Sequence, residues 1–305
     1  MTERITEVAV GATRTEGGTR TRSYRVGGAS ALPGMGDAGA RPLIALEICD
    51  DPALWPVVVL EEVGDLAGDL SGWAKAAEER WGADLVRLVL TSTRRRGFDD
   101  PASSGKAVGE VLAATGLPLI VEGSIDPALD TGVFRRCGEA GEGERLLLGT
   151  AEAERYRSVA AAALAYGHAV LAQTPIDINL AKQLNILLRE TGVPHDRIVI
   201  DPYTGALGYG FEYSYSVMER VRTAALAGDA DLAMPVISAA QDSLTVREVR
   251  EAPEGERVET AVQWEFYAAF SAAVAGAGIV CVRHPGTVGM LREAIADLWG
   301  GEGWR

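Results

Sequence analysis

The sequence predicts an α/β fold, a closed (β/α)8 TIM barrel preceded by a short N-terminal β-hairpin. Eight short apolar runs alternate with longer segments in which apolar residues have helical spacing. The runs are almost continuously apolar, which is typical of parallel strands buried on both faces. Eight strands also close into a barrel that its own side chains can fill. The length of 305 residues suits one such barrel with a small addition.

The strands are expected where the apolar runs lie, at 43–49, 84–90, 117–123, 145–150, 169–174, 197–201, 232–238 and 278–284. Helical stripes are expected at Leu180, Leu184, Leu187 and Leu188, and at Val217, Met218, Val221 and Ala225. Thr287 is the expected N-cap of a last helix that carries Val288, Leu291, Ile295 and Leu298 on one side.

The first part of the chain differs from the rest. Residues 1–42 are rich in Gly, Thr and Arg and have no helical period, and two alternating runs, 7–13 and 21–28, flank Gly17 and Gly18. This pattern predicts a β-hairpin and a connector at 1–42, followed by the barrel at 43–305. The polar stretch 239–262 is longer than an ordinary strand-to-helix loop, so we expect an excursion on the functional rim.

Composition excludes several classes of function. The net charge of −14 disfavours nucleic acid as a partner. No apolar run approaches the roughly 20 residues of a membrane span. The start, MTERITEVAVG, has charges where a secretory signal needs apolar residues, so a cytoplasmic location is expected.

The cysteines and histidines do not predict a metal site. Cys49, Cys137 and Cys281 lie far apart, and three cysteines cannot hold a four-cysteine iron–sulfur cluster. The three histidines, at 168, 195 and 284, show no ligand spacing. We therefore expect buried thiols, and any iron–sulfur cluster would belong to another chain.

Polar side chains follow the expected strands, where a parallel barrel gathers them on one rim. They are Glu47, Asp50, Ser92, Thr93, Glu122, Thr150, Glu152, Gln173, Asp177, Asn179, Asp201, Thr204, Ser238, Gln241, Arg283 and His284. Any barrel rim is polar, so each has a structural alternative. Asp177 precedes a helix and is expected to cap it, Asp201 could brace its loop or touch a ligand, and a structural role is favoured for His284.

The loop after 197–201 contains glycines and aromatic residues. GALGYG at 205–210 is not the dinucleotide-binding pattern. The rings of Tyr203, Tyr209, Phe211, Tyr213 and Tyr215 could offer a flat surface to a planar ligand or partner, or pack onto the barrel. Ser/His/Asp, Walker, HExxH and Asp-x-His-x-x-Gly patterns are all absent from the sequence, and no catalytic residue is predicted.

Three stretches carry a resemblance to a known family. TPIDINLAKQLNILL, DPYTGALGYG with EYSYSVMERVR, and VRHPGTV resemble the small (delta) subunit of the corrinoid iron–sulfur protein, part of the CO dehydrogenase/acetyl-CoA synthase (acetyl-CoA decarbonylase/synthase) system. VGGASALP and ALEICDDP resemble its N-terminal region. The sequence departs from the family at Tyr203, at Gly286-Thr287 and within 242–262, all on or near the rim.

The resemblance implies a TIM barrel that pairs with a large subunit holding a [4Fe–4S] cluster and a cobalamin. The heterodimer would carry a methyl group from a methyl-tetrahydropterin methyltransferase to acetyl-CoA synthase, both transient partners. This chain would shield the corrinoid without independent catalytic activity or a metal of its own. The implied corrinoid-contacting residues are Gln173, Asp177, Asn179, Asp201, Tyr203, Thr204, Gly205, Gly208 and Tyr209.

Two alternative functions remain open on the sequence alone. The chain could be a stand-alone pterin-dependent methyltransferase, with Gln173, Asp177, Asn179 and Asp201 bonded to the pterin ring. It could also be a structural scaffold of a multienzyme complex.

Overall fold

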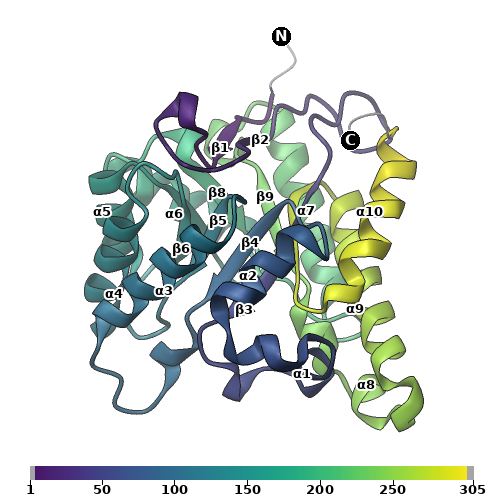
Figure 1. Ribbon diagram of the computed structural model, residues 1–305. Helices are drawn as coiled ribbons and strands as arrows, with labels where there is room; N and C mark the ends of the chain where they lie inside the picture. The colour runs from purple at the N-terminus through teal and green to yellow at the C-terminus, as the bar shows by residue number, and fades with distance from the viewer. Residues whose placement is uncertain (1–3, 301–305) are drawn as a thin grey trace.

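The strands of the computed structural model, which describes residues 4–300, form a closed barrel in the order β10-β3-β4-β5-β6-β7-β8-β9 (Figure 1). The strand pairings around the barrel are parallel. The strands are β3 Leu43–Cys49, β4 Leu85–Val89, β5 Leu119–Glu122, β6 Leu147–Ala151, β7 Ala169–Gln173, β8 Ile198–Asp201, β9 Val236–Ala239 and β10 Ala277–Val282. The predicted fold class is confirmed.

Helices surround the barrel, and several begin at an aspartate. They are α1 Val57–Val63, α2 Leu70–Glu79, α3 Pro101–Ala114, α4 Pro127–Ala140, α5 Tyr156–Tyr166, α6 Ile178–Glu190, α7 Phe211–Leu226, α8 Arg247–Glu251, α9 Arg257–Val274 and α10 Pro285–Trp299. The N-cap side chains of Asp69, Asp100, Asp126 and Asp177 accept hydrogen bonds from backbone N–H groups of the first turn. Within residues 4–300, no helix has the length and apolar character needed to cross a membrane.

The N-terminal segment closes one end of the barrel. β1 Val8–Val10 pairs antiparallel with β2 Tyr24–Val26, at the top of Figure 1. The side chains of Val8, Val10 and Val26 pack with the inward-facing residues of the strands. This hairpin therefore seals the amino-terminal end, and the chemistry must be sought at the carboxyl end. The division of the chain at residue 42 stays a prediction.

A buried arginine fastens the hairpin to the barrel. The Nε of Arg20 lies 2.8 Å from Oε2 of Glu144, and its Nη atoms donate to the carbonyl oxygens of Leu112 and Thr115 at 2.7 and 2.6 Å. Arg20 is almost completely buried, so the hydrogen-bonded acceptors compensate its charge.

Three local predictions were wrong. The strand expected at 232–238 begins at Val236, because residues 230–232 form a 3-10 turn and Pro235 has no N–H for a strand ladder. Thr287 is not the N-cap of α10, since the ring of His284 accepts the cap bond from the N–H of Gly286 at 3.0 Å. The predicted helical stripes were wrong at Leu180 on α6 and Leu298 on α10, which are 41% and 53% exposed.

The long connection between β9 and α9 is largely helical. It contains η7 Gln241–Thr245, α8 and η8 Glu254–Glu256 before α9 begins at Arg257. In Figure 1, α8 lies at the lower end of the barrel with α1, opposite the hairpin. These segments follow β9 and β3, so they border the carboxyl-end opening, here called the mouth.

Candidate functional site at the mouth of the barrel

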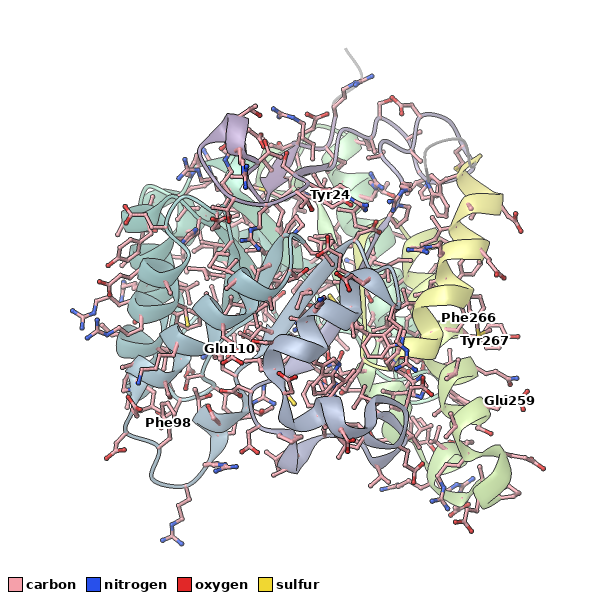
Figure 2. The ribbon with its side chains drawn as sticks, viewed as in Figure 1. Tyr24, Phe98, Glu110, Glu259, Phe266 and Tyr267 are labelled. Atoms are coloured by element: carbon pink, nitrogen blue, oxygen red, sulfur yellow. The ribbon has the colours of Figure 1, made fainter. Side chains whose placement is uncertain are left out.

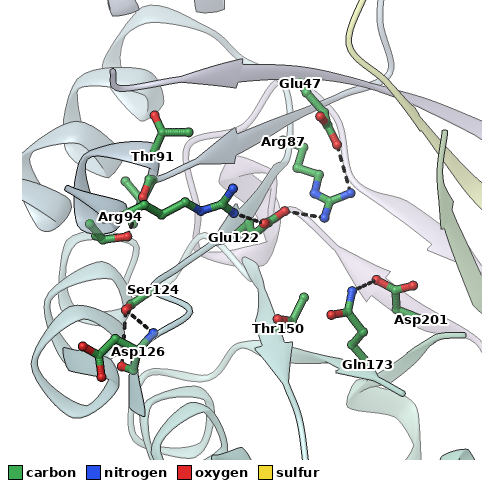
Figure 3. A network of polar contacts seen from close by, with 12 residues as sticks. Glu47, Arg87, Thr91, Arg94, Glu122, Ser124, Asp126, Thr150, Gln173 and Asp201 are labelled. Carbon is green, nitrogen blue, oxygen red and sulfur yellow. Dashed lines mark hydrogen bonds and ion pairs between the residues drawn. The ribbon is translucent and has the colours of Figure 1, made fainter. Parts of the chain in front are cut away.

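A chain of ion pairs crosses the mouth of the barrel (Figure 3). Arg87, on β4, lies 3.0 Å from Glu47 and 2.5 Å from Glu122 through its two terminal nitrogens. Arg94 binds the other oxygen of Glu122, and Arg283 lies 2.8 Å from the second oxygen of Glu47. The guanidinium of Arg283 also stacks over Trp55, with its Cζ 3.9 Å from the ring centre.

These ion pairs hold Glu122 and Arg87 in their charged forms although both groups are shielded from water. Burial works to raise the pKa of Glu122, but the guanidinium groups of Arg87 and Arg94 outweigh it and lower this pKa. Burial works against the charged form of Arg87, yet Glu122 and Glu47 together raise its pKa well above the ordinary value. Both groups therefore stay ionised and paired, and neither is available as a proton-transferring group near neutral pH.

Gln173 and Asp201 lie side by side at the ends of β7 and β8 (Figure 3). The amide Nε2 of Gln173 donates to Oδ2 of Asp201 at 2.7 Å, and the N–H of Tyr203 donates to Oδ1 at 2.9 Å. Burial raises the pKa of Asp201, and the positive charge of Arg87 and the bond from Gln173 limit the rise. Both proposed readings of Asp201 remain open, because it braces its loop and also faces the mouth.

The backbone of Tyr203 is strained. Its φ is 59°, in the left-handed region that residues with a Cβ rarely adopt. Such strain costs on the order of 1–3 kcal/mol and is most often found at functional sites. The bond to Asp201 holds this conformation, which leaves the ring 43% exposed on the rim.

The other predicted contact residues are spread over the rim. Asp177 caps α6, with Oδ1 accepting from the N–H groups of Asn179 and Leu180 at 2.7 and 3.1 Å, so its predicted structural role is confirmed. Asn179 is exposed in the first turn of α6. Thr204 is buried, and its hydroxyl lies 2.9 Å from that of Ser238.

The predicted contact residues Gly205 and Gly208 lie in the turn that carries the rim tyrosines. Gly208 has a φ of 75°, and a Cβ on Gly205 would lie 3.0 Å from the carbonyl carbon of Gly210. Local backbone geometry thus accounts for both. Their contact with a ligand stays a prediction, as it does for the whole set of predicted contact residues.

Rim tyrosines join the glycine turn to the excursion after β9. The hydroxyl of Tyr203 donates to Asp242 at 3.0 Å, and that of Tyr209 donates to Glu248 at 2.9 Å. Their rings stay exposed, and other large apolar side chains of the rim loops and first helical turns are exposed with them. These rim residues are Leu54, Val57, Ile125, Leu180, Tyr203, Tyr209 and Tyr213. The rim therefore offers apolar surface around a mouth whose charges are paired.

A cavity of about 500 Å³ lies beside the mouth, between the loop after β6 and α6. Its wall is mostly apolar, with Leu184 and Leu187 at its side and Gln173 and Tyr203 at the edge shared with the mouth. Thr174 is one of its lining residues, and the buried hydroxyl of Thr174 has no hydrogen-bond partner among residues 4–300. Such a pocket can take an apolar group that also offers a hydrogen-bond donor or acceptor.

Sequence reasoning placed Glu47, Glu122 and Arg283 on the rim but missed Arg87, Arg94 and Glu265, which organise the mouth with them. Arg87 stands inside an apolar strand, and a charge in the middle of a fully buried run was a readable signal of a buried ion pair. Arg94 lies in the run Arg94-Arg95-Arg96, which Asp99 and Asp100 follow closely in the sequence. Glu265, on α9, is completely buried and accepts bonds from the N–H groups of Arg283 and His284 at 2.7 and 3.1 Å.

The histidines and cysteines have structural surroundings. His284 is buried and caps α10, which confirms the structural reading, and His168 is buried with Nε2 2.9 Å from the carbonyl oxygen of Gly138. The three cysteines are free and buried, as expected. In residues 4–300, no group of three His, Cys, Asp or Glu side chains is arranged to hold a metal ion.

Solved structures with a similar fold include dihydropteroate synthases. The enzyme from Xanthomonas albilineans, with 4-aminobenzoic acid, matches 86% of this chain and 94% of its own, at a TM-score of 0.59 and 18% identity. The Thermus thermophilus enzyme, in complex with 4-aminobenzoate, covers 96% of this chain and 99% of its own, at a TM-score of 0.57 and 17% identity. These similarities support the barrel fold.

The sequence relatives identify the family, whereas the similar structures support only the fold. Subunit delta 1 of the acetyl-CoA decarbonylase/synthase complex of Methanosarcina thermophila is 36% identical over 98% of this chain and 72% of its own length. Subunit delta of the Methanopyrus kandleri complex is 36% identical over 95% of this chain and 74% of its own. The model of the CO dehydrogenase/acetyl-CoA synthase delta subunit family matches residues 7–275. This chain therefore belongs to the CO dehydrogenase/acetyl-CoA synthase delta subunit family.

Proposed function

We propose that this chain is a non-catalytic subunit of a methyl carrier and that its barrel mouth covers a corrinoid held by a large partner subunit. The observation that supports this most is the contrast within the mouth. The charged groups across its centre pair with one another, whereas its rim exposes apolar and aromatic side chains. Such a surface is suited to cover another molecule and poorly suited to proton transfer or nucleophilic attack.

The rim fits a large flat ring better than a metal ion. When bound by the partner, a corrinoid supplies the cobalt that carries the methyl group. The rings of Tyr203 and Tyr209 could pack against it and exclude water, and the amide of Gln173 could bond its polar edge. The buried His284 caps a helix and is not free to act as a ligand from this side.

The partners follow from the same proposal. A large subunit with the corrinoid and a [4Fe–4S] cluster would be the permanent partner, and a methyl-tetrahydropterin methyltransferase and acetyl-CoA synthase would bind transiently. The relatives support the existence of partner subunits, because they are named as subunits of a complex. The expected cytoplasmic location stays a prediction.

The experiment is co-expression with a large corrinoid subunit, with Tyr203→Ala and Tyr209→Ala tested against Tyr267→Ala. Tyr267 is 55% exposed on the outer wall at α9, where Figure 2 labels it, so it is a matched control. We expect both rim variants to weaken the complex at least tenfold and to speed oxidation of reduced cobalt, followed by its absorption spectrum. The control should change neither. Two separate peaks for the wild-type pair in size-exclusion chromatography would overturn the proposal.

A second candidate is a stand-alone methyltransferase that binds a pterin in the mouth. It is favoured by the adjacent amide and carboxyl groups of Gln173 and Asp201, which could bond a heterocycle. Calorimetry of the isolated chain with methyl-tetrahydrofolate decides between the two, since saturable binding lost in Asp201→Asn would support the methyltransferase. A scaffold role instead predicts that Tyr203→Ala alters assembly but leaves cobalt oxidation unchanged.

A further inference from the structure

A small cavity lies at the amino-terminal side of the barrel, away from the mouth. About 20 Å³ of it is open to the centre of a water-sized sphere, and it is lined by the connector after β2, α7, α10 and the turns before β9 and β10. Pro42, Pro235 and Trp299 are among its apolar walls. Of the described residues that line it, Arg222 alone carries a charge.

Arg222 is buried without a carboxylate. Its side chain comes from α7, the residue is 8% exposed, and its recorded bond is from Nη2 to the carbonyl oxygen of Gly276, at 3.3 Å. None of the ion pairs found among residues 4–300 includes Arg222. One long bond to a carbonyl leaves most of its five N–H donors without a strong acceptor.

Other buried arginines of this protein are each paired with a carboxylate. Arg20 lies 2.8 Å from Glu144, Arg87 lies 3.0 Å from Glu47, and Arg155 lies 3.1 Å from Asp130. A buried charge is costly unless it is paired and hydrogen-bonded, and arginine does not escape this cost by losing its proton. Burial lowers the pKa of Arg222, and no carboxylate opposes the shift. Arg222 thus lacks the counter-charge that the other three have.

The backbone around Arg222 preserves room for the guanidinium. Gly276 has a φ of 107°, and a Cβ there would lie 2.9 Å from Nε of Arg222. About 20 Å³ of the remaining space is open to the centre of a water-sized sphere. A monatomic anion therefore fits beside the guanidinium.

We propose that this cavity binds one small monatomic anion, of the size of chloride, which is held by Arg222 and stabilises the fold. The anion supplies the missing counter-charge between the connector and α7, so the site acts on stability and not on the mouth. This inference does not depend on the proposed function.

The test is urea unfolding of the full chain in sodium chloride and in sodium gluconate at equal ionic strength. A ligand that binds only the folded state lowers the unfolding constant about tenfold for each tenfold rise in its concentration above the dissociation constant. We expect that slope for chloride, little effect of gluconate, and chloride-dependent broadening in chlorine NMR. Arg222→Met should abolish both the chloride slope and the broadening in chlorine NMR.

The matched control is Arg220→Met, which removes the same charge from an exposed position two residues away on α7. It should keep the full chloride dependence. If Arg222→Met does not fold, Arg222→Lys serves instead and should weaken chloride binding at least tenfold. Equal stability of the wild-type chain in chloride and gluconate, or the same chloride slope in the Arg222 variant, would overturn the proposal.

Discussion

Arg87 links the buried Glu47 to the partly buried Glu122 across the mouth. Its neighbours Glu47 and Glu122 come from β3 and β5, on either side of β4. These ion pairs between adjacent strands hold the side chains of Arg87, Glu47 and Glu122 together at the base of the mouth. The ion pairs therefore account for the charged side chains of Arg87, Glu47 and Glu122 across the mouth.

Replacing Arg87 should be strongly destabilising. Arg87→Met leaves Glu47 completely buried beside Arg283 alone and removes one of the two cations at Glu122, and breaking a buried pair costs about 3–5 kcal/mol. Urea unfolding measures the loss. The control is Lys75→Met, which breaks an exposed pair with Glu79 and should cost no more than about 0.5 kcal/mol. Similar losses in both variants would contradict the structural role of the network.

Glu265 should make stability depend on pH. Burial raises its pKa from 4.5 to about 7, so the folded state binds the proton more tightly than the unfolded state. The stability from this group is therefore fully present below pH about 4.5 and is lost as the pH rises through about 7. Urea unfolding between these limits should show a decline of about 3 kcal/mol from this residue.

The variant Glu265→Gln cannot titrate and should flatten that part of the stability curve. Glu259→Gln is the control, because Glu259 is exposed on the same helix (Figure 2). It should leave the decline unchanged. A wild-type decline that persists in Glu265→Gln would assign it to other groups.

In the loops after β7 and β8, residues that hold the loop in shape lie within a few positions of residues exposed on the rim. Asp177 caps α6, and the exposed Asn179 and Leu180 follow it in the first turn. Asp201 braces the strained turn that presents Tyr203. A predicted contact residue in these loops can therefore affect binding directly or only by holding its loop.

The two roles of Asp177 can be separated. Asp177→Ala should lower the free energy of unfolding by about 1 kcal/mol, because two N–H groups of α6 lose their acceptor. Asp177→Ser keeps a capping oxygen and should restore most of the stability. If Asp177 only caps the helix, Asp177→Ser should also restore affinity for the large subunit. A stable Asp177→Ser chain that still binds poorly would assign the carboxylate a direct contact.

The strands could be predicted from the sequence more fully than the site. An almost continuously apolar run such as 43–49 needs no knowledge of its neighbours, and β3 has these bounds. The strand at 232–238 was misplaced because Pro235 and a 3-10 turn interrupt an apolar run. The ion chain could not be predicted, since Glu47 and Arg283 meet only when the barrel closes, 236 residues apart in sequence.

The two ends of the barrel differ in structure, one being closed and the other exposed. The amino-terminal end is sealed by the hairpin, with its valines in the barrel core and Arg20 bonded to the barrel loops. The carboxyl end exposes tyrosines and leucines around the paired charges. In barrels of this kind the first end usually serves stability and the second binding.

This division predicts opposite effects at the two ends. Arg20→Met leaves Glu144 buried without its cation and should lower the free energy of unfolding by about 3–5 kcal/mol, while affinity for the large subunit at low temperature stays within about twofold. The exposed ring of Tyr209 contributes little to the fold, so Tyr209→Ala should change stability by less than about 0.5 kcal/mol yet weaken the complex at least tenfold. Unfolding and binding measured on the same preparations test both. Loss of affinity in Arg20→Met under conditions where it is fully folded would place partner contacts at the sealed end, and the mouth would no longer be the docking face.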